Sequence, residues 1–276
     1  MVSYKIVASD LDGTLLNSKV AVSAENRQAM RDMAANGVHF VPTSGRTLTE
    51  IPLSIREDPA VRFSIYSDGA GIYDREAKAH ICTAYMSRED SLFLLDVLGQ
   101  YRTILTVRHK GVSYVDVTRN NDAQYKEHRL SNKYRDFIYE TNQPVGDYDS
   151  FCRSLGELEM ICAFFADDSE QQACKRRLEA TGKYQTGSSE RTNLEIFSSE
   201  AGKGRALLRL AAHLGVDPAA TIGVGDSTND SDLLARAGLG LAVSNAYDEL
   251  KAIADAVICS NDEHAMQYIL EHYIKA

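Results

Sequence analysis

The stretch Ile6-Val7-Ala8-Ser9-Asp10-Leu11-Asp12-Gly13-Thr14 decides how the rest of the chain is interpreted. Its apolar start predicts a short buried strand, and Asp10 and Asp12 follow where that strand ends. Ligands of open α/β sheets bind at the carboxyl ends of strands. Two acids this close together are costly to bury unless a cation or a shared proton relieves them. The stretch therefore predicts a hard-metal site or a nucleophile beside an acid/base, although calcium loops and Asx turns use the same D-x-D-G pattern.

The composition is that of an ordinary soluble globular protein. The chain has 276 residues, of which 44% are hydrophobic and 25% charged, enough for one large domain or a domain with an insertion. The net charge of −9 argues against a nucleic-acid partner, which needs a basic face. It also means that an anionic substrate must be attracted locally, by a metal or by a few cations.

The cysteines and the N-terminus indicate the compartment. The five cysteines are odd in number and form no C-x-x-C pair, which fits neither a disulfide framework nor a zinc site. A reduced, intracellular protein is the simpler interpretation. Acids interrupt the only early apolar run, and no run approaches the roughly 18 to 20 residues of a membrane helix. We expect a cytoplasmic protein with no membrane partner.

Short apolar runs alternate with helical patterns in the first and last thirds of the chain. We expect strands at 5–9, 38–41, 63–66, 194–197, 221–224, 239–243 and 256–258. Helices are expected at 23–36, 204–214, 230–237, 247–254 and 264–273. This alternation predicts an α/β fold with a doubly wound parallel sheet and right-handed crossovers.

The middle of the chain has a different pattern. Residues 85–187 are rich in Tyr, Arg and Asn, with strands expected at 103–108 and 112–117 and helices at 91–100 and 169–180. We interpret this segment as an inserted α+β domain with linkers near Ala84 and Ser188. The doubly wound core then comprises residues 1–84 and 188–276.

Two further segments carry candidate phosphate contacts. Ser44, followed by Gly45 and Arg46 at a strand end, is a candidate contact for phosphate oxygens, and an ordinary helix N-cap is the alternative. Lys203 opens a helix, where the helix dipole favours anions. A lysine that reaches a negative charge across a cleft explains that position, and an exposed surface lysine is the alternative.

The segment Gly223-Val-Gly-Asp-Ser-Thr-Asn-Asp-Ser-Asp-Leu-Leu234 again sets acids at the end of an apolar run. Asp226 lies where a metal ligand would lie, and Asn229 and Asp230 follow one helical turn later. A helix N-cap needs one aspartate rather than such a cluster.

Taken in order, these segments resemble the haloacid dehalogenase superfamily of phosphohydrolases. The signatures are D-x-D-G-T at 10–14, Ser before G-R at 44–46, K-G at 203–204 and G-D-x-x-N-D at 225–230. The insertion between the second and third is similar to the Cof-type group, which carries a large α/β cap there. Asp68-Gly69-Ala70 and the segment 242–246 are further resemblances. The resemblance covers the Rossmann-like core, and the cap matches in length and placement only.

Three departures from the family pattern stand out. Asp68 replaces the usual Asn, Leu233-Leu234 stands where a Met is common, and Asn261-Asp-Glu-His264 lacks the Gly that often follows this acidic turn. None of them touches a catalytic position. Asp68 and His264 are positions at which substrate fit or proton balance would differ.

The resemblance implies a role for each candidate residue. Asp10 is the nucleophile, and it forms an aspartyl-phosphate. Asp12 protonates the leaving alkoxide and then deprotonates the attacking water. Ser44 and Lys203 hold the transferring oxygens, and Lys203 offsets the charge of Asp10. The expected phosphate and substrate contacts are Asp10, Ser44, Gly45, Arg46, Lys203 and Asn229.

The resemblance also implies a metal site. Mg²⁺ fits because it prefers oxygen ligands in octahedral geometry and tolerates several waters. The expected ligands are Asp10, the main-chain carbonyl of Asp12, and Asp226. Asn229 and Asp230 are expected to orient Lys203 and the metal-bound waters.

The sequence thus predicts a Mg²⁺-dependent phosphatase for a small phosphorylated metabolite, with a sugar phosphate favoured, in a monomer or small homo-oligomer. A phosphomutase on the same scaffold and a non-catalytic phosphometabolite-binding module are the alternatives. The joint presence of the nucleophile and Asp12 disfavours the latter, because binding alone needs neither. In the cap, the basic clusters at 108–110 and 126–129 would contact a sugar phosphate or form a solvated face.

Overall fold

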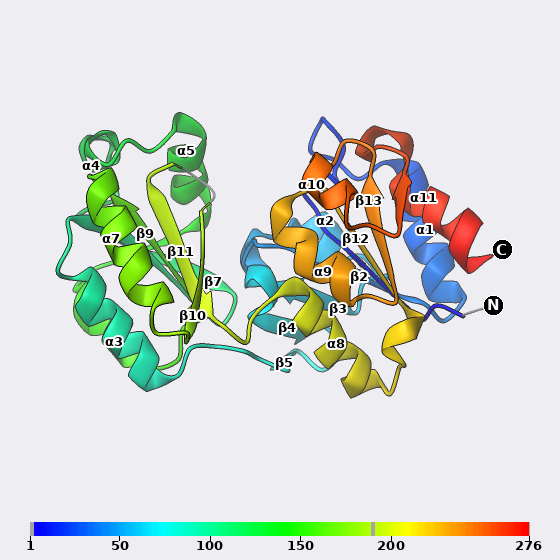
Figure 1. The fold of residues 1–276 in the computed structure, drawn as a ribbon, viewed down its shortest axis with the longest axis horizontal. Coiled ribbons are helices and arrows are strands. Elements are labelled where there is room, and N and C mark those ends of the chain that lie inside the picture. The colour runs from blue at the N-terminus through cyan, green and yellow to red at the C-terminus, as the bar shows by residue number, and fades with distance from the viewer. Residues whose placement is uncertain (1–2, 189–190, 276) are drawn as a thin grey trace. The chain divides into compact units, whose positions relative to one another are not determined.

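The computed structural model describes residues 3–188 and 191–275 (Figure 1). The chain divides into two compact units. The first unit comprises residues up to 46, 51–83 and from 202 onward, and the second unit comprises 47–50 and 84–201. Each unit has its own sheet and its own helices, as two α/β bodies in one chain.

The first unit is built on a five-stranded parallel sheet. Its strand order is β14-β13-β12-β1-β2, and each neighbouring pair is parallel. The strands are β1 (Ile6–Ser9), β2 (His39–Pro42), β12 (Thr221–Gly225), β13 (Leu239–Val243) and β14 (Ala256–Ile258). The chain winds outward from β1 to β2 in one direction and from β12 to β14 in the other. The switch point lies between β1 and β12, where ligands bind in such folds.

Helices cover this sheet as the alternating pattern predicts. They are α1 (Ala24–Ala35), α2 (Leu53–Arg56), α8 (Lys203–Leu214), α9 (Ser231–Arg236), α10 (Asp248–Lys251) and α11 (Ala265–Ile269). Short 3₁₀ turns lie at Ser67–Gly69, Pro218–Ala220, Thr228–Asp230 and Asn261–Glu263, and a π-helical turn at Leu270–Ile274. Helix α1 packs against α11, and α8 packs against α9 (Figure 1). The doubly wound α/β fold is confirmed.

One predicted strand of the parallel sheet pairs differently. Strand β3 (Phe63–Tyr66) forms a three-stranded antiparallel sheet with β4 (Gly71–Asp74) and β5 (Ala79–Ile81). A single parallel bridge between Thr43 and Ile65 links β3 to the end of β2. The apolar pattern of β3 identifies a buried strand, but it does not identify the partner strand.

The second unit has a mixed six-stranded sheet with the order β10-β11-β9-β6-β7-β8. All its pairs are antiparallel except β7 with β8. The strands are β6 (Thr103–His109), β7 (Val112–Asp116), β8 (Gln143–Val145), β9 (Met160–Phe165), β10 (Tyr184–Gly187) and β11 (Asn193–Ser198).

Both faces of this sheet carry apolar clusters. The helices of the second unit are α3 (Arg88–Leu98), α4 (Asp122–Glu127), α5 (Asn132–Thr141), α6 (Tyr148–Leu155) and α7 (Asp168–Glu179). Val107 and Phe165 lie in a cluster with residues of α3, α6 and α7. Ile104 and Phe164 lie in a cluster with Tyr125 of α4 and Ile138 of α5. Alternate residues of β6 and β9 thus serve opposite faces.

The boundaries of the second unit differ from those expected at 85 and 187. Residues 194–197 belong to β11, which pairs with β9 and β10 rather than with the parallel sheet, so this unit extends to Ala201. Residues 47–50 also join it. The main-chain N–H and Oγ1 of Thr49 donate to the carbonyl of Gly111 at 3.0 and 2.9 Å, and the Ser113 hydroxyl donates to Glu50 at 2.8 Å.

Two global expectations can be compared with this structure. In the part of the chain that is described, none of the helices combines the length and the apolar character needed to cross a membrane. Each of the five cysteines is a free thiol.

Candidate active site

Asp10 is held at the carboxyl end of the central strand β1. Its main-chain N–H donates to the Val224 carbonyl of β12 at 2.9 Å, and only 5% of the residue is exposed. The chain turns immediately afterwards at Gly13, with φ of +85°. A Cβ at this position would lie 2.3 Å from the Asp226 carboxylate. The glycine of D-x-D-G is therefore needed both for the turn and for the approach of the second acid.

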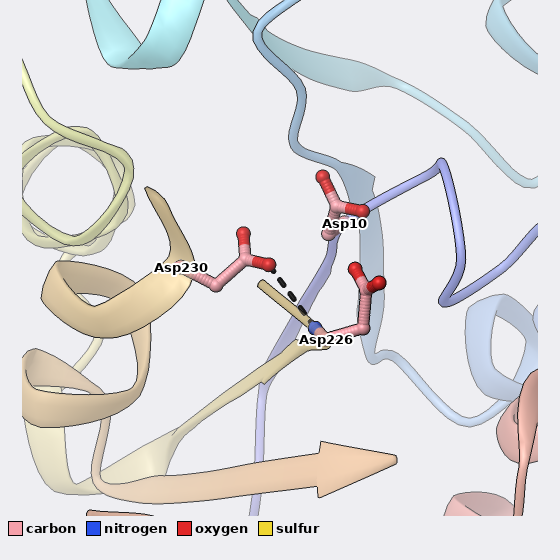
Figure 2. Close-up of side chains that lie close together, drawn as sticks. All are labelled: Asp10, Asp226 and Asp230. Atoms are coloured by element: carbon pink, nitrogen blue, oxygen red, sulfur yellow. Dashed lines mark hydrogen bonds between the residues drawn. The ribbon is translucent and has the colours of Figure 1, made fainter. Parts of the chain in front are cut away.

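Asp226 follows β12, the parallel neighbour of β1, so the two acids meet at one edge of the sheet. Figure 2 shows the carboxylates of Asp10 and Asp226 side by side, with Asp230 next to them. One carboxylate oxygen from each residue lies within 4.8 Å of the other two. The Thr14 hydroxyl donates to Asp226 at 3.3 Å. The predicted convergence of the first and last motifs is present in the structure.

Asp230 has both carboxylate oxygens engaged. One accepts the main-chain N–H groups of Asp226 and Ser227, each at 3.1 Å, and the first of these bonds is drawn in Figure 2. The other accepts the Lys203 ammonium at 2.6 Å. The side chain is fully buried. Asp230 therefore fixes the loop after β12 and orients Lys203, as expected for a supporting residue.

Lys203 is buried at the start of α8 and reaches the acids of the sheet edge. Its Nζ lies 2.7 Å from Asp10 and 2.6 Å from Asp230, and its side chain is 0% exposed. The start of α8 is satisfied by Asp232, which accepts the N–H groups of Gly204 and Arg205 at 3.0 and 3.1 Å. An acid from α9 thus offsets the unfavourable cation at this helix end. The alternative of a surface lysine is excluded.

Negative charge exceeds positive charge in this cluster. Burial raises the pKa of Asp10 well above its usual range; Lys203 opposes the rise, while Asp230 and Asp226 add to it. Burial also raises the pKa of Asp226 to about 6, again with help from Asp230. Burial alone would lower the pKa of Lys203, but Asp10 and Asp230 raise it. One ammonium cannot neutralise three carboxylates, so the cluster favours a proton or a further cation.

The donor set fits a hard divalent cation. Its atoms are carboxylate oxygens, which Mg²⁺ prefers, and burial together with neighbouring acids raises the pKa values of Asp10 and Asp226. Asp10 and Asp226 are the better ligands, because both oxygens of Asp230 already accept hydrogen bonds.

Asp12 forms its ion pair with Arg46. Its side chain is 54% exposed, and its two oxygens accept Nε and Nη2 of Arg46 at 2.8 and 2.7 Å. Arg46 was expected to contact phosphate, and in this structure its guanidinium forms a two-pronged ion pair with Asp12 instead. Such forked pairs are geometrically specific.

Ser44 and Gly45 form the turn after β2. Ser44 is 2% exposed; its N–H donates to the Ile65 carbonyl at 3.0 Å, and its hydroxyl accepts the Arg46 N–H at 3.2 Å. The hydroxyl thus holds a local turn rather than capping a helix, since the next helical turn begins at Leu48, and the contact with phosphate stays a prediction. The carboxylate of Asp68 lies directly over Gly45, 2.9 Å from where a Cβ would be.

Asn229 occupies a different place from the one expected. Its amide oxygen accepts the Ser227 hydroxyl at 2.5 Å, and its Nδ2 donates to Asp68 at 3.4 Å. Lys203 is contacted by Asp230 rather than by Asn229.

Asn245, which was not among the predicted site residues, supports the turn after β1. Its Nδ2 donates to the Gly13 carbonyl at 2.8 Å. The resemblance at 242–246 was the available signal for this contact.

The two basic clusters of the second unit separate into buried and exposed members. Arg108 is 6% exposed in the sheet, where burial opposes its charge and Glu50, followed by Tyr134 and Glu195, raises its pKa. His128 is also buried, whereas Lys110, Lys126 and Arg129 are exposed. Each cluster therefore combines a buried residue with solvent-exposed residues, and only the exposed residues can form a solvated face.

Comparison with known proteins assigns the class. The family model of haloacid dehalogenase-like hydrolases matches residues 7–270. The chain belongs to this family, as the four motifs predicted.

Individual relatives match over nearly the full length. Phosphatase YwpJ of Bacillus subtilis is 31% identical, with 98% of this chain and 100% of the relative covered. The 5-amino-6-(5-phospho-D-ribitylamino)uracil phosphatase YwtE of the same organism is 28% identical, with 98% of each covered. The solved structure of the HAD subclass IIB sugar phosphatase BT4131 aligns with a TM-score of 0.78 at 18% identity, covering 98% of each chain, which supports the fold.

Proposed function

We propose that this protein is a Mg²⁺-dependent phosphatase that hydrolyses a small phosphorylated metabolite, with a sugar phosphate as the favoured class. The observation that carries the proposal is the buried Asp10–Lys203–Asp230 chain beside Asp226. It combines a fixed carboxylate nucleophile, a cation for phosphoryl oxygens and a place for a metal. The relative YwtE is named for a phosphorylated ribityl compound, which is a phosphate ester of a polyol.

Asp10 is the proposed nucleophile. Its carboxylate attacks phosphorus, the bond to the leaving oxygen breaks, and an aspartyl-phosphate forms. The strand end and the main-chain bond to Val224 hold Asp10 in place, while Lys203 lies close enough to neutralise charge on the transferring group. Phosphoryl transfer depends mainly on such positioning and charge neutralisation. Water then attacks the acyl-phosphate and regenerates the carboxylate.

Asp12 is the proposed acid/base, and its ion pair with Arg46 sets a condition on that role. Both carboxylate oxygens of Asp12 are engaged by the Arg46 guanidinium and face away from any leaving group while the pair is formed. Asp12 must therefore leave Arg46 before it protonates the leaving alkoxide. It then accepts a proton from the water of the second step.

The carboxylates of Asp10 and Asp226, with the Asp12 carbonyl, would hold Mg²⁺. When bound, the ion would neutralise the excess negative charge of the cluster and polarise the phosphoryl group. We propose further that the second unit contributes to the choice of leaving group, because the proposed roles of Asp10, Lys203 and Asp226 concern the phosphoryl group and the metal.

The test is a phosphate-release screen across sugar phosphates, nucleotides, pyridoxal phosphate and flavin mononucleotide with Mg²⁺. Release that EDTA abolishes, and that the Asp10→Asn variant lacks, supports a phosphatase. Transfer of phosphate to an added sugar, in preference to water, would favour a phosphomutase. Binding of these compounds without turnover would favour a binding module.

A further inference from the structure

One acid close to the proposed phosphoryl site has no part in the mechanism above. Asp68 lies in the turn after β3, where Ser67, Asp68 and Gly69 all adopt positive φ values of 49°, 48° and 85°. Successive left-handed residues are costly for side chains other than glycine. Such strain persists only where the surroundings impose it.

The surroundings of this turn hold it against the active-site cluster. The Ser67 N–H donates to the Arg46 carbonyl at 2.8 Å, and the Asp68 N–H donates to the Ser44 carbonyl at 3.1 Å. A Cβ on Gly69 would lie 2.2 Å from the carbonyl oxygen of Gly202, the residue before Lys203. The turn is therefore fixed between the segment of Ser44 and the start of α8.

The Asp68 carboxylate lies on the outer side of this cluster. It packs over Gly45, accepts Nδ2 of the exposed Asn229 at 3.4 Å, and contributes to the charge that surrounds Lys203. Lys203 and Asp230 are fully buried, whereas Asp68 is half-buried. A phosphate ester held by the buried Lys203 would therefore extend its leaving group toward solvent, past the half-buried carboxylate of Asp68.

We propose that Asp68 is a specificity-determining residue that selects leaving groups bearing hydroxyl or amino groups and disfavours those bearing a second anionic group. This proposal rests on the proposed function. An ionised carboxylate accepts hydrogen bonds from hydroxyl and ammonium groups and repels carboxylates and phosphates. Asn229 and the strained turn keep the carboxylate in place, so it does not turn away from an incoming anion.

The experiment compares two substrates of the same length. Sorbitol 6-phosphate and 6-phosphogluconate differ in that a terminal CH₂OH is replaced by a carboxylate. The wild type is expected to have the higher kcat/KM for sorbitol 6-phosphate. Asp68→Asn is expected to reduce this preference about tenfold, the order for two unit charges about 8 Å apart at a partly solvated site. Asparagine tolerates the left-handed conformation, so the variant fits the turn.

Two further variants separate charge from shape. Asp68→Glu keeps the charge and is expected to retain the wild-type preference. Asp32→Asn removes one charge from the exposed side of α1 and is expected to leave the ratio unchanged. Raising the ionic strength should weaken the wild-type preference, because salt screens charges at a half-exposed site.

The outcomes distinguish this inference from the proposed function. Equal substrate ratios in wild type and Asp68→Asn, with active enzyme, would overturn the role of Asp68 alone. A ratio that changes as much in Asp68→Glu as in Asp68→Asn would also overturn it, because shape rather than charge would then decide. A wild type inert toward both substrates and toward p-nitrophenyl phosphate would overturn the proposed function and this inference with it.

Discussion

Each unit buries a cation among acids, but the two arrangements differ in charge balance. Lys203, in the first unit, contacts two carboxylates directly and lies beside a third at the carboxyl edge of the parallel sheet. Arg108, in the second unit, lies within the mixed sheet near two acids, Glu50 and Glu195, and the Glu50 oxygens accept the Thr47 N–H and the Ser113 hydroxyl. Burial, with a further contribution from neighbouring acids, raises the pKa values of Asp10 and Asp226 beside Lys203.

The comparison shows that burial of a charge is not by itself a sign of chemistry. A buried ion pair whose partners are satisfied fixes structure, and breaking it is costly. A buried cation surrounded by three carboxylates leaves net negative charge, which a bound cation can neutralise. Removing each arrangement should therefore affect different properties of the protein.

Asp10→Asn should produce the largest effect, and the effect should be on turnover alone. Loss of the nucleophile removes at least ~5 kcal/mol of transition-state stabilisation, which is a rate decrease of some thousandfold or more. The fold should be retained, because the amide has the same shape and relieves a crowded charge. Steady-state phosphate release with a matched circular dichroism spectrum measures both. Activity above about one percent of wild type would show that Asp10 is not the nucleophile.

Arg108→Met should have its main effect on stability. It removes the cation whose charge opposes that of the buried Glu50 carboxylate, and an uncompensated buried charge costs about 3–5 kcal/mol. Urea unfolding measures the loss. Adding Glu50→Gln should recover part of it, because the buried Glu50 charge is then removed as well. If the double variant is as unstable as the sum of the single variants, the two side chains are not coupled.

Mg²⁺ should stabilise the folded protein through the acids of the first unit. A ligand at about 100 times its dissociation constant adds about 2.7 kcal/mol of stability. Thermal melting with Mg²⁺ and with EDTA measures the difference, which should disappear in Asp226→Asn. Ca²⁺ should also stabilise the protein but support turnover poorly, since its looser coordination misplaces the nucleophile. An equal shift in Asp226→Asn would place the metal elsewhere.

The smallest expected effect is a pH dependence of the metal-free protein. The folded state raises the pKa of Asp226 to about 6, so it binds more protons than the unfolded state between about pH 4 and pH 6. The contribution of Asp226 to stability therefore falls as pH rises through this window. After allowance for solvent screening of a half-buried group, the loss is about 1 kcal/mol.

Asp226→Asn should remove this slope, so its stability relative to wild type should increase from pH 4 to pH 7 in EDTA. Asp32→Asn provides a comparison of opposite sign below about pH 4, because hydrogen bonds from Gln28 and Lys275 lower the pKa of Asp32 from its usual value. If the difference in unfolding free energy between Asp226→Asn and wild type does not change with pH, the pKa of Asp226 is the same in the folded and unfolded states.

The sequence predicted the first unit better than the second for a physical reason. Parallel strands joined by helices bring their carboxyl ends to one edge, so the convergence of Asp10 and Asp226 follows from topology. Strand β11 has an equally clear apolar pattern, but nothing in that pattern distinguishes the two sheets. Its pairing with β9 depends on residues far earlier in the chain, as in Ile196 with Ile161, 35 positions before it.

Side-chain partners within the site were predicted less well than its location. The K-G and G-D-x-x-N-D motifs correctly indicated that Lys203 lies near an acid of 225–230. Asn229 and Asp230 were both expected to orient Lys203, and the short 3₁₀ turn places only Asp230 against it. Arg46 was likewise identified as a residue of the site, but its ion pair with Asp12 follows from two loops that sequence patterns do not place.

The four residues Thr47–Glu50 limit how the second unit of this protein can be exchanged for that of a relative. They follow the Ser44-Gly45-Arg46 turn of the first unit, but their contacts belong to the second unit, through Gly111 and Ser113. A chimera that exchanges only 84–201 for the corresponding part of a relative would keep the buried Glu50 but replace the sheet that it contacts, including its hydrogen-bond donor Ser113. Grafting a new specificity onto this core therefore requires two separate pieces of the donor chain, the long insertion and this short segment.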